Sequence, residues 1–342
     1  MSSGSLLKRL DRLGWWPAAW VGRLLAVLLW PAPLTGSTTL VIRPGGMGDL
    51  VLLTLAFREL GISMDQVTWL IEKRSEVWAR YLGLNYHCYD SSPIQVLFKI
   101  LGRFDLVLNT EQFFGLSQAF ALAARKKGGR VVCFSTNRGA RFADEKVRYD
   151  AFEERESDAF GHLVAAGFSK PWISKKWTER TQGATGVPVV AVAGLQAESR
   201  QFDLKFWKTL VLKTCSQGKF ILSGSPQDTL FVRDLAKEFE DRCEIFSGSF
   251  SDLCAQIAIS PKLITVDGGM VHIASYFGVP SNVIFTAGRA SKWAPLGKGS
   301  AVMVRTDLKC QPCTLFGQVP PCDFHFECKK LDLNSEVFIS NG

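Results

Sequence analysis

The sequence predicts an α/β protein of two domains, each a parallel β-sheet with crossover helices. Its 342 residues exceed what a single hydrophobic core usually organises. From Thr38 onward, short β-branched apolar runs alternate with longer runs of helical periodicity, which is typical of a parallel sheet. Helix bundles and all-β folds fit this alternation poorly.

The first domain is expected over residues 37–170. Its predicted strands are Thr39–Ile42, Val67–Ile71, Leu106–Leu108 and Arg130–Cys133. Its predicted helices are Leu50–Leu60, Ser75–Leu82, Pro93–Leu101 and Leu116–Ala124. Residues 171–187 lose periodicity and gain Lys, Thr and Gly, so they are the expected interdomain linker.

The second domain is expected over residues 188–342. Its predicted strands are Val189–Val192, Phe220–Leu222, Leu263–Val266 and Asn282–Phe285, and its predicted helices are Leu204–Cys215, Gln227–Phe239 and Val271–Tyr276. Ligands of open α/β sheets bind at the carboxyl ends of the strands, so two such Rossmann-like halves predict a ligand cleft between them.

Residues 1–36 are rich in tryptophan and poor in charge. From Leu13 to Leu34 the only charged residue is Arg23, and Pro17 and Pro31 leave a helix too short to span a bilayer comfortably. An amphipathic helix in the membrane interface fits best. A cleaved signal peptide and a helix packed on the protein are the alternatives.

The formal charge of +8 favours anionic partners, among them nucleotides, phosphorylated glycans and an acidic membrane. No basic run interleaved with aromatic residues occurs, so no nucleic-acid partner is expected. The nine cysteines, an odd number in a long chain, fit a reducing compartment better than a disulfide scaffold.

A glycine-rich turn follows the first predicted strand and contains Gly45, Gly46 and Gly48. Its spacing is neither that of a P-loop nor that of a dinucleotide fingerprint. The turn brings the carboxylate of Asp49 to the expected cleft, either as a helix cap or as a general base. Arg43, just before the turn, is a candidate phosphate contact.

A second strand, glycine pair and helix occur around Asp267. The backbone amides of Gly268, Gly269 and Met270 at a helix N-terminus predict an anion site suited to a pyrophosphate. His272, one turn into the helix, is within reach of the same anion. A plain turn capped by Asp267 is the alternative.

Together these motifs resemble glycosyltransferase family 9, the bacterial heptosyltransferase-like enzymes of GT-B fold. The resemblance rests on R-x-x-x-x-G-D-x-x-x-x-T at Arg43 to Thr54, D-x-G-x-x-H at Asp267 to His272, Pro280, and C-x-P-C at Cys310 to Cys313. It covers the chain from Thr38 to about Cys328.

The resemblance implies roles for individual residues. Asp49 matches the catalytic base, and Asp267, Gly269 and His272 match the donor-binding loop. Arg200 stands where the family usually has a phosphate-binding Lys, and Asp228 where it has a ribose-binding Glu. These two departures leave the identity of the donor open.

The implied reaction is an inverting, metal-independent transfer from a nucleotide diphosphate sugar such as ADP-heptose to a lipopolysaccharide-type glycolipid or an oligosaccharide. It would take place on the inner face of the cytoplasmic membrane. A sugar-nucleotide epimerase of the same fold and a non-catalytic nucleotide-binding membrane protein are the alternatives.

Four cysteines near the C-terminus have no role in the reaction described above. They are Cys310, Cys313, Cys322 and Cys328, and their spacing is open to a structural zinc site, reduced thiols or disulfides. The basic stretch from Phe134 to Tyr149 is either a contact for an anionic acceptor or a solvated loop.

Overall fold

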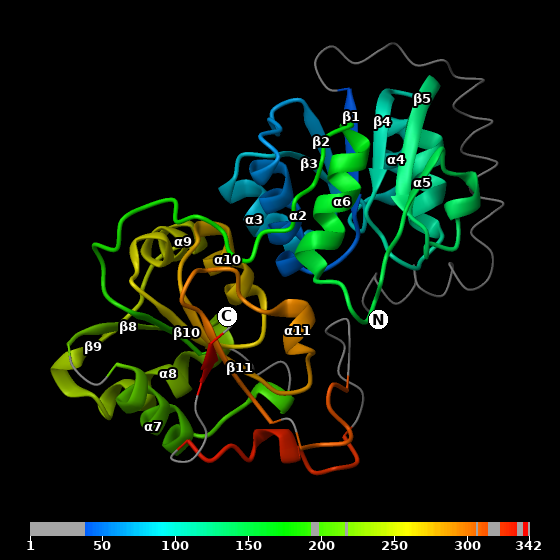
Figure 1. Cartoon of the computed structure of the whole chain (residues 1–342). Coiled ribbons are helices and arrows are strands. Elements are labelled where there is room, and N and C mark those ends of the chain that lie inside the picture. The colour runs from blue at the N-terminus through cyan, green and yellow to red at the C-terminus, as the bar shows by residue number, and fades with distance from the viewer. Residues whose placement is uncertain are drawn as a thin grey trace. The chain divides into compact units, whose positions relative to one another are not determined.

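The computed structural model describes residues 38–192, 198–215, 218–305, 307–313, 322–333 and 338–340. They form two compact units that divide between Ser174 and Lys175, inside the expected linker (Figure 1). The expected helix at 1–36 lies outside the described residues. No helix among the described residues is long and apolar enough to cross a membrane.

The first unit contains a six-stranded parallel sheet of order β3-β2-β1-β4-β5-β6. The strands are β1 (Thr39–Arg43), β2 (Val67–Ile71), β3 (Asn85–Cys88), β4 (Phe104–Asn109), β5 (Arg125–Phe134) and β6 (Glu145–Val147). The helices are α2 (Met47–Glu59), α3 (Glu76–Tyr81), α4 (Pro93–Ile100), α5 (Leu116–Ala124) and α6 (Glu156–Gly167).

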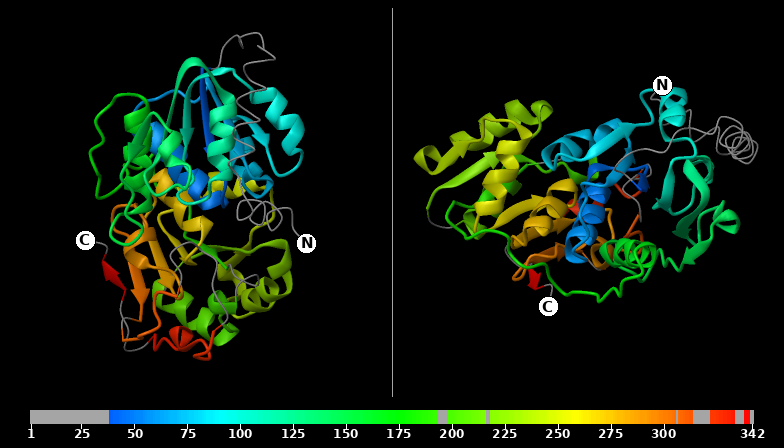
Figure 2. Two further views of the ribbon diagram at one scale, coloured as in Figure 1. Left: turned by 90° about the vertical axis from the view of Figure 1, so that its right-hand side faces the viewer. Right: turned by 90° about the horizontal axis from the view of Figure 1, so that it is seen from above.

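Both faces of the first sheet are covered by helices (Figure 2). Leu40 and Ile42 of β1 join a core with Val96 and Ile100 of α4 and with α5. On the other face α2 packs against α6, and the ring of Phe57 in α2 lies 5.1 Å from that of Trp69 in β2. Because β1 is buried on both faces, its three central residues, Leu40, Val41 and Ile42, are all apolar.

The second unit contains a seven-stranded sheet of order β13-β12-β11-β10-β7-β8-β9, parallel except for β13. The strands are β7 (Val189–Ala191), β8 (Phe220–Ser223), β9 (Cys243–Ile245), β10 (Leu263–Val266), β11 (Ser281–Phe285), β12 (Ala301–Val304) and β13 (Ile339–Ser340). The helices are α7 (Leu204–Thr214), α8 (Thr229–Lys237), α9 (Phe250–Ile259), α10 (Gly269–Phe277) and α11 (Ala290–Trp293).

Helices α7 and α8 bury Trp207, Leu210 and Leu235 against one face of the second sheet, whereas α9 packs beside α10. Residues 175–187, expected as part of a free linker, are bound to this unit along their length. The amide of Thr178 donates to Leu296 O at 2.7 Å, that of Thr181 to Phe277 O at 3.0 Å, and that of Gly186 to Ile259 O at 3.0 Å. We call this segment the strap.

Candidate active site

The glycine-rich turn is shorter than the sequence suggested. Helix α2 begins at Met47, three residues before the predicted start, so Gly48 and Asp49 lie in its first turn and Gly46 is the N-cap. The Gly46 amide donates to Oδ2 of Asp49 at 3.1 Å, which is the N3-to-N-cap half of a capping box. Asp49 therefore caps the helix, which is one of the two roles expected for it.

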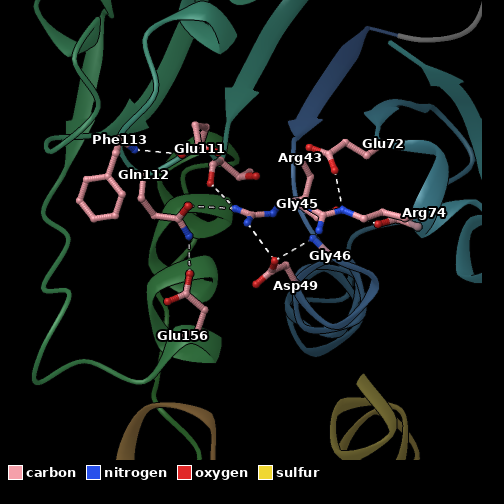
Figure 3. A network of polar contacts seen from close by, with 12 residues as sticks. Arg43, Gly45, Gly46, Asp49, Glu72, Arg74, Glu111, Gln112, Phe113 and Glu156 are labelled. Carbon is pink, nitrogen blue, oxygen red and sulfur yellow. Dashed lines mark hydrogen bonds and ion pairs between the residues drawn. The ribbon is translucent and has the colours of Figure 1, made fainter. Parts of the chain in front are cut away.

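Asp49 also forms an ion pair with Arg43, with 3.1 Å between Nη2 and Oδ2 (Figure 3). The Asp49 side chain is 20% exposed, whereas that of Arg43 is 5% exposed. Nη1 of Arg43 donates to the carbonyl oxygen of Thr110 at 2.7 Å and to Oε1 of Gln112 at 3.2 Å. The guanidinium of Arg43 is thus buried against protein groups and holds the partly exposed carboxylate, and its contact with a phosphate stays a prediction.

Gly45 lies directly against this ion pair. A Cβ at position 45 would be 2.6 Å from Nη2 of Arg43 and 2.9 Å from Oδ2 of Asp49. Both distances are far below van der Waals contact, so a side chain there would push the two groups apart. The glycine at this position keeps the carboxylate and the guanidinium together.

The network continues to residues that the sequence motifs did not indicate. Nε2 of Gln112 donates to Oε1 of Glu156 at 2.5 Å, and the hydroxyl of Tyr149 donates to Oε2 of Glu156 at 2.8 Å. Thr110, Glu111 and Gln112 form a polar run immediately after the buried strand β4, at the same sheet edge as the end of β1. That run was the signal available in the sequence.

Glu111 is a second buried carboxyl group beside Arg43. Its Oε1 accepts the amides of Phe113 at 3.1 Å and Phe114 at 3.4 Å. Burial raises the pKa of Glu111 above its usual value, although Arg43 and the two amides oppose the shift. Burial alone would lower the pKa of Arg43, but Asp49, Glu111 and Glu156 outweigh it and raise that pKa overall.

The raised pKa of Glu111 predicts a pH dependence of stability. A carboxyl group whose pKa is higher in the folded state stabilises the fold below its unfolded pKa, and this contribution is lost as pH rises through the folded pKa. We expect Glu111→Gln to lack this loss. The unfolding free energy of the variant should therefore rise relative to that of wild type as pH increases from 4.5 to 8. Urea unfolding of both proteins across this range measures the two free energies. If the value for the variant minus that for wild type stays constant or falls as pH rises, the prediction is contradicted.

The second unit holds a separate pair of charged residues. Arg200 donates from Nε to Oδ1 of Asp267 at 3.2 Å and from Nη2 to Oδ2 at 3.3 Å, a bidentate arrangement. Asp267 is buried, and burial raises its pKa although Arg200 opposes the shift. Arg200 keeps 22% of its side chain exposed, so it can contact a ligand while it holds Asp267.

Helix α10 begins immediately after this pair. The helix begins at Gly269, two residues before the predicted start. Gly268 is its N-cap, and Gly269 and Met270 lie in its first turn. The amides at a helix N-terminus attract anions, so Arg200 and α10 present positive potential from one loop region. The imidazole of His272 is buried, with its ring 5.7 Å from that of Trp293.

Asp228 differs from its expected role in binding a ribose. The residue is 2% exposed, and its Oδ2 accepts the amide of Ser225 at 2.9 Å and the Ser225 hydroxyl at 2.5 Å. It closes a capping box at the start of a 3-10 turn, Pro226–Asp228. The structure thus gives Asp228 a local structural role in place of a group presented to a ligand.

All nine cysteines lie in the described residues as free thiols, including the four near the C-terminus. Burial raises the pKa of Cys328 to about 11, and the neighbouring thiols add to the shift. Among the described residues, no group of three or more His, Cys, Asp or Glu side chains is arranged to hold a metal ion. Zinc at Cys310, Cys313, Cys322 and Cys328 stays a prediction.

The stretch from Phe134 to Tyr149 is structured. It contains the end of β5, a 3-10 turn at Ala140–Phe142, and the edge strand β6. Tyr149 at its end is buried and belongs to the Asp49 network through Glu156. An acceptor contact along the rest of the stretch stays a prediction.

Three solved glycosyltransferase structures are similar to this chain in fold. The E. coli heptosyltransferase WaaC with ADP aligns with a TM-score of 0.62 at 16% identity, covering 77% of this chain and 92% of that one. A family 9 glycosyl transferase from Veillonella parvula aligns with a TM-score of 0.62 at 14% identity, covering 84% and 93%. The E. coli ADP-heptose lps heptosyltransferase II gives 0.60 at 14% identity, covering 83% and 95%.

The chain therefore has the GT-B fold, that of a class of glycosyltransferases with two Rossmann-like domains. Residues 157–319 match the family model of glycosyltransferase family 9 (heptosyltransferase). No curated protein matches the sequence.

Proposed function

We propose that this protein transfers a sugar, heptose or a related one, from a nucleotide diphosphate sugar to a glycolipid acceptor, with Asp49 as the base. The observation that carries the proposal is the Asp49 carboxylate. It is partly exposed at the carboxyl edge of a parallel sheet and held by a buried arginine, in a chain whose residues 157–319 match the family 9 model. A carboxylate used only as a helix cap needs no buried cation.

The donor is proposed to bind the second unit. Arg200 and the N-terminus of α10 offer a guanidinium and backbone amides to a diphosphate. The structurally similar proteins are described as a heptosyltransferase with ADP and an ADP-heptose heptosyltransferase, which supports an ADP-sugar. Asp228 accepts from the Ser225 amide and hydroxyl, and its contact with a donor ribose stays a prediction.

In the proposed reaction, Asp49 takes the proton of an acceptor hydroxyl as that oxygen forms a bond to the anomeric carbon of the donor. The bond from that carbon to the phosphate oxygen breaks, and its electron pair leaves with the nucleotide diphosphate. A single displacement of this kind inverts the anomeric centre. Arg200 and the α10 amides stabilise the developing charge, so we propose that no metal is required.

The acceptor is proposed to be a lipopolysaccharide-type glycolipid or a related oligosaccharide bound by the first unit. A peripheral position on the inner face of the cytoplasmic membrane would supply such an acceptor. The tryptophan-rich segment 1–36 is the sequence feature that supports this location.

The proposal is tested by incubating the protein with ADP-heptose and other sugar nucleotides, with and without truncated lipopolysaccharide acceptors, in the presence of EDTA. Release of nucleotide diphosphate that depends on acceptor, with an inverted product, supports it. Isomerisation of the donor without acceptor would identify an epimerase instead. Donor binding without turnover would favour a binding protein.

Arg200 gives a second prediction. We expect Arg200→Ala to weaken ADP binding about tenfold to a hundredfold, because a charge-assisted hydrogen bond to phosphate contributes about 1.5–3 kcal/mol. Arg200→Lys should restore only part of the affinity, since it lacks the planar fork. Isothermal titration calorimetry with ADP measures both, and thermal unfolding checks that buried Asp267 has not disrupted the fold.

Arg233, an exposed arginine on α8 in the same unit, supplies the matched control for charge. Its change to Ala should leave ADP affinity unchanged. Equal losses at Arg200 and Arg233 would show a general charge effect and remove the argument for a phosphate site at Arg200.

A further inference from the structure

The position of Arg43 depends on more than its ion pair with Asp49. Three carboxyl groups, those of Asp49, Glu111 and Glu156, act on this one buried guanidinium. A buried cation with several carboxylates nearby can pair with any of them, and only pairing with Asp49 orients the proposed base. Some feature of the fold must therefore make that choice.

Gln112 lies between Arg43 and Glu156 (Figure 3). Its Oε1 accepts from Nη1 of Arg43 at 3.2 Å, and its Nε2 donates to Oε1 of Glu156 at 2.5 Å. A side-chain amide can accept and donate at the same time, which neither a carboxylate nor an apolar group of that size can do. The amide keeps Glu156 hydrogen-bonded without a direct ion pair to Arg43.

Glu156 is fully buried in the first turn of α6. Both of its carboxylate oxygens are occupied, one by Gln112 and the other by the hydroxyl of Tyr149 at 2.8 Å. A carboxyl group at this depth needs such partners. These two hydrogen bonds fix the carboxylate, and the fixed carboxylate in turn fixes the orientation of the Gln112 amide.

We propose that Gln112 and Glu156 are positioning residues for the Asp49 base, acting through Arg43. Tyr149 and Glu156 orient the Gln112 amide, the amide orients Nη1 of Arg43, and Nη2 is left to hold Oδ2 of Asp49. This inference rests on the proposed function, because it assigns these residues to the transfer step. No motif in the sequence marks either residue.

The test compares Gln112→Met, Glu156→Ala and Glu156→Gln in the full chain, with kcat and donor KM measured in the acceptor-dependent assay. Loss of orientation by about 1 Å costs on the order of a hundredfold in rate, so we expect Gln112→Met and Glu156→Ala to lower kcat tenfold to a hundredfold. Donor KM should not change. Glu156→Gln should restore kcat to within a few-fold of wild type, because its amide can accept from Gln112 and donate to Tyr149.

Gln118→Ala is the matched control for lost stability. Gln118 is fully buried in the same unit and accepts from Nδ2 of Asn109 at 2.7 Å, outside the Asp49 network. All variants are assayed below the onset of thermal unfolding, so that Gln118→Ala should lose stability but keep its kcat. Positioning is overturned if Gln112→Met and Glu156→Ala lower kcat no more than this control, or if Glu156→Gln is as impaired as Glu156→Ala.

The same assay separates this inference from the proposed function. If wild type shows no acceptor-dependent transfer, or if transfer does not depend on Asp49, the proposed function fails and the positioning role fails with it. If transfer depends on Asp49 while Gln112→Met and Glu156→Ala match wild type, the proposed function stands and the positioning role alone is overturned.

Discussion

Asp49→Asn should lower acceptor-dependent sugar transfer by about a hundredfold to ten-thousandfold, the range over which general bases contribute. Asparagine nearly preserves the shape of the side chain and can still accept the Gly46 amide, but it cannot take a proton from an acceptor hydroxyl. Donor affinity should stay at the wild-type value, because Arg200 and Asp267 belong to the second unit. Initial rates of nucleotide diphosphate release and calorimetric titration with ADP measure the two effects.

The chain contains a matched control for this change. Asp252 occupies the same N3 position in α9, where its carboxylate accepts the Ser249 N-cap amide at 2.8 Å. Asp252→Asn should therefore affect the helix cap in the same way and leave transfer unchanged. Comparable rates for Asp49→Asn and Asp252→Asn would mean that Asp49 is a helix cap and not a base.

Arg43→Met should destabilise the protein by about 3 kcal/mol or more, the cost of removing one partner of a buried ion pair. The change leaves Asp49, Glu111 and Glu156 without the cation that balances them, and two of these carboxyl groups are almost fully buried. For a unit of this size the loss corresponds to roughly 6–12 °C in the midpoint of thermal unfolding. Transfer should also fall, because Asp49 loses the group that orients it.

The matched control here is Arg148→Met. Arg148 lies in the same unit with its side chain 89% exposed, and its contact to Asp150 is long, at 3.7 Å. Its removal should change the unfolding free energy by no more than about 0.5 kcal/mol. Differential scanning calorimetry compares the unfolding midpoints of the two variants. A difference of 2 °C corresponds to about 1 kcal/mol. If the Arg43→Met midpoint lies within 2 °C of the control's, the buried network contributes little to folding.

The sequence predicted the centre of each sheet better than its edges. Strands β1, β2, β10 and β11 were expected because strands buried on both faces are continuous apolar runs. Strand β3, with the sequence NYHC, is half-exposed and carries no such run, so it could not be recognised. Helix α6 begins within a charged segment and contains Gly161, which hid its periodicity.

The sequence indicated the residues of the two glycine-rich turns and missed the residues that reach them only through tertiary contacts. The glycines around Asp49 and Asp267 mark turns where a backbone approaches a ligand, and turns of this kind leave a visible pattern in the sequence. Gln112 and Glu156 are separated along the chain and meet only through tertiary packing. Nothing in local spacing reveals such a pair. Arg43 and Asp228, two charged residues near the motifs, both bind protein groups in the structure, which their position in the sequence did not indicate.

The strap bears on how the second unit could be produced by itself. A chain cut at residue 188 would lose the partners of Leu296 O, Phe277 O and Ile259 O, and would uncover the left-handed Gly278, over which Glu179 passes in close contact. Exposed backbone groups of this kind favour fraying and proteolysis. A truncated version intended for nucleotide-binding measurements should therefore start at Lys175, where the compact unit itself begins.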